Sequence, residues 1–80
     1  MDLDNLIVMA NKIGQFFAAQ PDRDEALAGI AEHVKKFWEP RMRAQMISYF
    51  EERQGAGLSD VAKAAIALLA SQAKAAAPTG

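Results

Sequence analysis

The side chains of this 80-residue sequence that could act as a base or a nucleophile are its single histidine, His33, and a few serines. A catalytic histidine needs an orienting carboxylate and a nucleophile nearby. Ser48, Ser59 and Ser71 form no recognisable pairing with His33, which lies among large apolar residues of a predicted helix. A histidine in such a setting is typically half-buried at the edge of a helix bundle. The sequence therefore predicts no catalytic site.

Other kinds of reactive site are also poorly supported. The paired carboxylates Glu51 and Glu52 are neighbours on a helix and point apart, so they indicate a solvated face. The order Leu58-Ser59-Asp60 is the reverse of the Asp-Ser-Leu motif that carries phosphopantetheine in acyl carrier proteins, and an N-cap is the better interpretation of Ser59. With no Cys and one His, the chain lacks the ligands for structural zinc or an iron–sulfur cluster. We expect no metal and no cofactor in this chain.

The stretch Lys35–Arg43 has the most unusual composition, with four cations interleaved with two aromatic residues and a proline. It could contact nucleic acid through phosphates and stacked bases. It could also bind a protein, because Trp and Arg are common interface hot spots, or it could be a tight bend with a solvated basic rim. The net charge of −1 argues against nucleic acid. We expect Phe37 and Trp38 to pack inward, and Arg41 and Arg43 to point outward toward a partner.

Apolar residues that recur every three to four positions predict an all-α fold, a small compact bundle of three to four short helices. The first helix covers about Leu3 to Ala19, and the second begins at Asp22. Pro40 stops the second helix and starts a third, which reaches about Gln54 before the left-handed cap at Gly55-Ala56-Gly57. A fourth follows Ser59. The short connections favour an antiparallel bundle. We assign residues 1–70 to one domain and 71–80 to an Ala-rich tail that frays.

The composition indicates how stable the fold can be and where in the cell the protein is expected. Hydrophobic residues make up 51% of the chain, but 17 of them are Ala, so the core is thin for 8.7 kDa and a partner is the natural further support. No run of 18 apolar residues and no signal-like N-terminus occurs. We therefore expect a soluble, cytoplasmic protein with no membrane and no nucleic-acid partner.

The first predicted helix has more apolar surface than one stripe. Ile7, Gly14 and Ala18 form a second strip of mostly small residues. Either another helix of the same domain or another protein fills this strip. Gly29, in the second helix, leaves a similar choice between a drifted surface position and the close approach of a partner.

Three blocks of the sequence resemble the delta subunit of soluble NAD-dependent, molybdenum-containing formate dehydrogenases. They are MANKIGQFF (9–17), KFWEPRMR (36–43) and GAGLS (55–59). With their spacing, the blocks span about Leu6 to Leu69. The middle block is the most specific. Its one departure is Glu39, where the family favours Asp, and both acids suit a helix N-terminus.

The resemblance implies a non-catalytic accessory subunit with no cofactor of its own. In such complexes the large subunit holds the molybdenum bis-guanine-dinucleotide centre and iron–sulfur clusters, and other subunits hold FMN, further clusters and the NAD site. This chain would bind the large catalytic subunit and the electron-transfer subunits, and support their assembly, maturation or stability. The residues that we expect at this interface are Ile7, Asn11, Gly14, Ala18, Lys36, Trp38, Pro40, Arg41 and Arg43.

Two alternatives to an accessory subunit follow from the same residues. One is a free-standing helical adaptor or regulatory protein-interaction domain. The other is a small nucleic-acid-binding domain that uses Lys35, Lys36, Arg41 and Arg43, whose binding would weaken steeply with salt.

Overall fold

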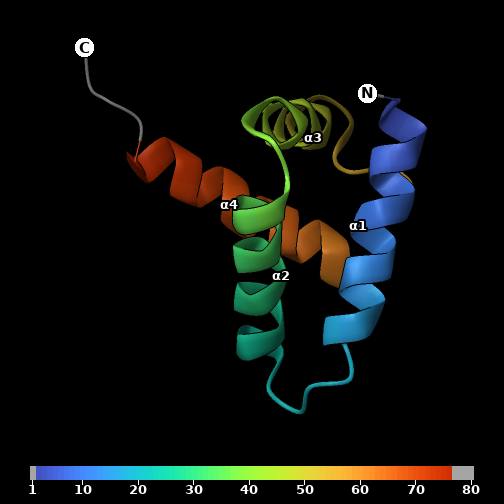
Figure 1. Ribbon diagram of the computed structural model, residues 1–80, viewed down its shortest axis with the longest axis vertical. Helices are drawn as coiled ribbons and strands as arrows, with labels where there is room; N and C mark the ends of the chain where they lie inside the picture. Colours follow the sequence, from blue (N-terminus) through green and yellow to red (C-terminus); the bar gives the residue numbers. More distant parts are fainter. Residues whose placement is uncertain (1, 77–80) are drawn as a thin grey trace.

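Four helices joined by short connections form the chain over residues 2–76, which the computed structural model describes, with side chains through residue 74 (Figure 1). They are α1 (Leu3–Phe17), α2 (Arg23–Phe37), α3 (Pro40–Arg53) and α4 (Asp60–Ala76). No strand occurs in this part of the chain. The prediction of a small all-α bundle is confirmed. None of the four helices is long and apolar enough to cross a membrane.

Three of the four helices begin at a side-chain cap, and α3 begins at a proline. The carboxylates of Asp2 and Asp22 accept hydrogen bonds from the backbone N–H groups two residues later, at 3.1 and 2.9 Å. The Ser59 hydroxyl accepts one from the N–H of Ala62 at 3.3 Å, which agrees with its prediction as an N-cap. Pro40 occupies the first turn of α3, where its missing N–H has no helical partner to lose.

The end of α3 turns left-handed one residue earlier than the glycine pattern suggests. Gln54 has φ 58°, followed by Gly55 at φ 72° and Gly57 at φ 91°. Gly55 is also buried, and a Cβ there would lie 3.2 Å from carbon atoms of both Leu58 and Phe50. The loop therefore needs glycine at position 55 for space as well as for backbone conformation.

The helices are not all antiparallel. α1 and α2 run side by side in opposite directions, whereas α4 crosses this pair obliquely and α3 is seen nearly end-on above it (Figure 1). α4 contacts each of the other three helices. The antiparallel arrangement predicted for the whole bundle thus holds for α1 and α2, and the other two helices pack across them.

Every helix contributes a large side chain to the core, and α4 also contributes small buried residues. The largest fully buried side chains are Leu6, Ile30, Val34, Met46 and Ile66. Between them α4 contributes small residues, and Ala62 and Ala65 are both fully buried.

The proposed boundary between domain and tail falls within a helix. α4 passes through residue 70 and continues to Ala76. Residues 77–80 of the predicted tail lie outside the described residues.

At Gly14, α1 packs closely against α4. A Cβ at this position would lie 3.1 Å from Val61 Cγ1 and 3.3 Å from the Ala62 Cβ. The sequence leaves open whether another helix of the same domain or another protein fills the small-residue strip. At Gly14 it is a helix of the same domain, α4.

We expect Gly14→Leu to destabilise the chain, because the larger side chain pushes α4 away from α1. Overpacking of this kind costs about 1–3 kcal/mol, and the gain of up to about 1 kcal/mol from replacing a helical glycine offsets only part of it. The midpoint of urea unfolding should fall. Gln15→Leu, at the exposed neighbouring position, is the matched control. A midpoint as high as that of the unchanged chain would contradict this packing.

Candidate functional site

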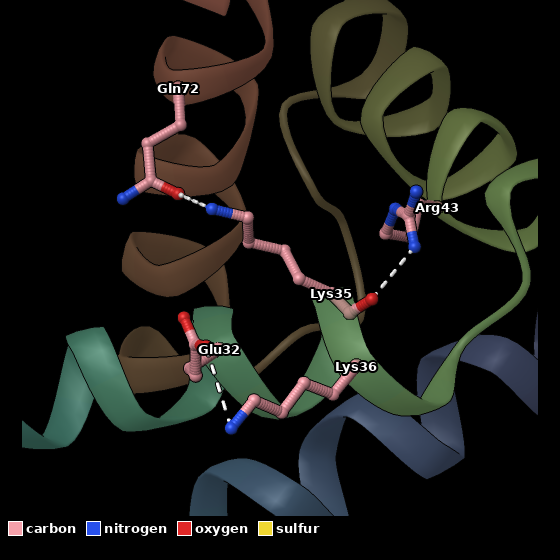
Figure 2. A network of polar contacts seen from close by, with 5 residues as sticks. All are labelled: Glu32, Lys35, Lys36, Arg43 and Gln72. Atoms are coloured by element: carbon pink, nitrogen blue, oxygen red, sulfur yellow. Dashed lines mark hydrogen bonds and ion pairs between the residues drawn. The ribbon is translucent and has the colours of Figure 1, made fainter.

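The basic corner, defined as residues 35–43, joins α2 to α3 and divides into an inward and an outward half. Arg43 belongs to the inward half. Its Nη1 donates a hydrogen bond to the backbone carbonyl of Lys35 at 2.9 Å (Figure 2). The same nitrogen donates a second one to the carbonyl of Trp38 at 3.0 Å. Carbonyls at the end of a helix have no partner within the helix, and a cation there is favourable. The prediction that Arg43 points outward is wrong, because the side chain caps the end of α2.

The two lysines of the corner extend to different elements (Figure 2). Lys35 Nζ donates to Gln72 Oε1 of α4 at 3.2 Å. Lys36 Nζ lies 3.7 Å from Glu32 Oε1, one turn earlier on α2, and both side chains are more than half exposed. Such an exposed pair is worth at most about 1 kcal/mol. Lys36 therefore remains available at the surface.

The two aromatic residues of the corner face opposite ways. Trp38 is 4% exposed and belongs to the core, whereas Phe37 is 71% exposed. The prediction that both pack inward is correct for Trp38 and wrong for Phe37. Consecutive residues at the end of a helix project about 100° apart, so burying one ring turns the other outward.

Phe37 belongs to a row of rings that crosses from α1 to α2. The centroids of Phe16 and Phe17 are 5.2 Å apart, those of Phe17 and His33 are 6.4 Å apart, and those of His33 and Phe37 are 4.7 Å apart. Phe17 lies directly over Gly29, where a Cβ would come within 2.6 Å of its ring. Gly29 is thus explained by a contact within the chain, an interpretation that the sequence analysis did not include.

These rings line an open depression, which we call the aromatic groove. One end has a volume of about 530 Å³, and an adjoining part has about 330 Å³. Its lining residues are Met9, Lys12, Ile13, Phe16, Phe17, His33, Phe37, Trp38 and Met42. Phe16 is 74% exposed at the rim.

Asn11 fastens α1 to the loop that precedes α4. Its Nδ2 donates to the Gly57 carbonyl at 3.0 Å, and its Oδ1 accepts from the Ser59 N–H at 2.8 Å. Both ends of the amide are therefore used within the chain. Ile7 lies beside the same loop, with its Cγ2 3.6 Å from the position of a Cβ at Gly57.

The nine residues predicted at a partner interface are thus split between interior and surface. Gly14 and Trp38 are buried, and Ile7, Asn11 and Arg43 are half-buried with contacts inside the chain. The exposed members are Ala18, Lys36, Pro40 and Arg41. Three of these four lie in the basic corner.

The residues with catalytic potential are not assembled into a site. His33 lies between the rings of Phe17 and Phe37, Ser59 caps α4, and Glu51 pairs with Lys74 at 2.9 Å. Among the described residues, no three His, Cys, Asp or Glu side chains form a group that could bind a metal ion. None of the polar or charged side chains in this part of the chain is buried.

Comparison with known families shows to which family the chain belongs. Residues 5–66 match the model of the NADH-dependent formate dehydrogenase delta subunit, FdsD. The chain belongs to this family. No curated protein and no solved structure matches it. As a delta subunit, it is a component of a formate dehydrogenase with other subunits, and the resemblance drawn from the three sequence blocks is confirmed.

The aromatic groove is the feature of this delta subunit that sequence reasoning missed. The sequence does contain a sign of exposed aromatic residues, namely the two adjacent aromatic pairs Phe16-Phe17 and Phe37-Trp38. Neighbouring helical residues cannot share one narrow face, so one member of each pair had to lie at the edge of the core or outside it.

We expect Arg43→Met to destabilise the delta subunit by about 1–3 kcal/mol, because two backbone carbonyls lose a charged donor. The substitution retains an apolar stem of similar length. Arg41→Met, two residues earlier and exposed, should change stability by less than about 0.5 kcal/mol. Equal thermal midpoints for the two variants would show that Arg43 does not cap α2.

We also expect Asn11→Ala to destabilise the subunit by about 1–3 kcal/mol, since it leaves a carbonyl and an N–H of the 57–59 loop without their partner. Hydrogen exchange should show faster exchange at the Ser59 amide. Asn5→Ala removes only a 3.8 Å contact with the Met9 sulfur and serves as the control. An unchanged Ser59 exchange rate in Asn11→Ala would argue against the connection.

Proposed function

We propose that this delta subunit binds the large catalytic and electron-transfer subunits of a formate dehydrogenase in the cytoplasm, and supports their assembly, maturation or stability. It supplies no catalytic group of its own. The observation that carries the proposal is the family match over residues 5–66. Two surface features support it, the aromatic groove and the exposed half of the basic corner.

The exposed half of the corner presents charge at the surface. Lys36 is exposed in the last turn of α2, where it forms an ion pair with the exposed Glu32, and Pro40 and Arg41 are exposed at the start of α3. Arg43 and Trp38, in contrast, are engaged in holding the bend between α2 and α3. A rigid bend that presents two cations and a proline suits recognition of an acidic surface on a partner.

The size and composition of the chain also favour a bound state. The fully buried part of α4 is built mainly from Ala, which contributes little apolar area per residue. A partner that binds the folded chain adds to its stability by mass action. An accessory subunit that is permanently bound can therefore function with a thin core.

The test is replacement of the native chain by tagged variants in cells that produce the whole complex. Lys36→Glu with Arg41→Glu should lower the amount of co-purified larger subunits at least about tenfold, because two contacts become repulsive. Formate-dependent NAD reduction and molybdenum content of the eluate should fall with it. Arg23→Glu, an exposed charge reversal at the other end of α2, is the control.

The outcomes separate the proposal from its rivals. If the unchanged chain elutes alone at low salt, the subunit proposal fails and a free-standing adaptor is the better interpretation. If the unchanged chain elutes with the complex and the double variant does too, binding stands but the corner is not its contact. Retention on nucleic acid that disappears as salt rises would favour the nucleic-acid alternative.

A further inference from the structure

We propose that the aromatic groove is a docking site for an amphipathic segment of a larger formate dehydrogenase subunit, one that presents apolar side chains together with a carboxylate. This inference rests on the proposed function and goes beyond it, because it names a surface separate from the basic corner and the chemistry of its occupant.

The exposed rings are the first argument. Phe16 and Phe37 are about three-quarters exposed, and they line a groove that the half-buried Ile13 and Met42 also line. Scattered apolar residues on a surface are ordinary, but aromatic residues gathered at one apolar groove mark a binding site. Apolar anchors spaced like those of an amphipathic helix suit such a groove between two helices.

The groove is also held in shape before anything binds. Phe17 is seated against Gly29, and the His33 and Phe37 rings are in contact one turn apart on α2. Both walls therefore belong to packed helices rather than to loops. Binding to a surface that is already ordered loses little conformational entropy.

Charge defines the occupant more closely. Lys12 lines both parts of the groove, and no Asp or Glu is among the lining residues. The groove thus combines apolar walls with one cation that has no carboxylate opposite it in the lining. A segment with apolar anchors and an acidic residue complements it.

A second copy of this chain complements it poorly. Two grooves placed face to face would offer Lys12 no carboxylate, because the lining contains none. Phe16 and Phe37 together expose roughly 300 Å², so these two residues alone supply less than half of the ~800 Å² per partner of a stable interface. This area suits one short segment within a larger contact rather than a dimer built on the groove.

The test places an acidic side chain at the rim. Phe16→Glu and, separately, Phe37→Glu should each lower co-purification of the larger subunits at least about tenfold. Val8→Glu is the matched control, because Val8 is also a large exposed apolar residue of α1 and does not line the groove. Thermal unfolding of each purified variant shows that the fold is retained. Lys12→Glu should weaken binding as well, and Lys12→Arg should leave it unchanged.

The occupant is identified by photo-crosslinking within the complex. With p-benzoylphenylalanine in place of Phe16, we expect a crosslink to one peptide of a larger subunit that carries both apolar and acidic residues. The same group in place of Val8 should not label that peptide. A crosslink to a second copy of this chain, or to a peptide without an acidic residue, would overturn the assigned occupant.

Failure of this inference differs from failure of the proposed function. If the unchanged chain co-purifies with the complex while folded Phe16→Glu and Phe37→Glu bind equally well, the groove is not the docking site and the subunit function stands. If the unchanged chain does not co-purify at all, both fail.

Discussion

The close packing of α4 against the other three helices is the contact on which the rest of the structure depends. Where α1 meets α4, Gly14 leaves room for Val61 and Ala62, and α4 also buries the small residue Ala65. Alanine allows backbones to approach closely but removes little apolar area from water. The close approach of the helix backbones thus fixes how the helices are arranged. The modest number of large buried side chains limits the stability of the fold. The small residues that allow the helices to pack closely also leave the core with little apolar area.

The bend between α2 and α3 shows how one short segment serves two purposes. Folding back the chain at Pro40 exposes the carbonyl end of α2, and Arg43 supplies the donors that these carbonyls lack. Trp38 fills the interior of the bend. What is left over, Lys36 and Arg41, is exposed. Part of the unusual composition of the segment therefore serves to stabilise the bend between α2 and α3. Only the exposed residues of the segment are available to bind a partner.

Sequence reasoning succeeded where the physical rule is local. Asp22 and Ser59 cap the helices that the sequence predicts to begin there, because capping depends on a few neighbouring residues. It failed where the partner is distant in the chain. The direction of Arg43 depends on where α3 turns, and the contact between Phe17 and Gly29 depends on how α1 lies on α2. Apolar periodicity gives the mean direction of a helix face and not its edge, so it does not reveal that Phe16 is exposed.

The thin core and the exposed rings have one common physical explanation. A chain of this size buries only part of its surface, and here Phe16 and Phe37 are about three-quarters exposed. Phe17 is the ring of α1 that packs onto α2, against Gly29, whereas Phe16 and Phe37 stay exposed. Covering the rings with a separate segment instead removes their apolar area from water without disturbing the crossing of α1, α2 and α4. The stability of the folded chain is then coupled to binding, since any partner that covers the groove stabilises the helices that form it.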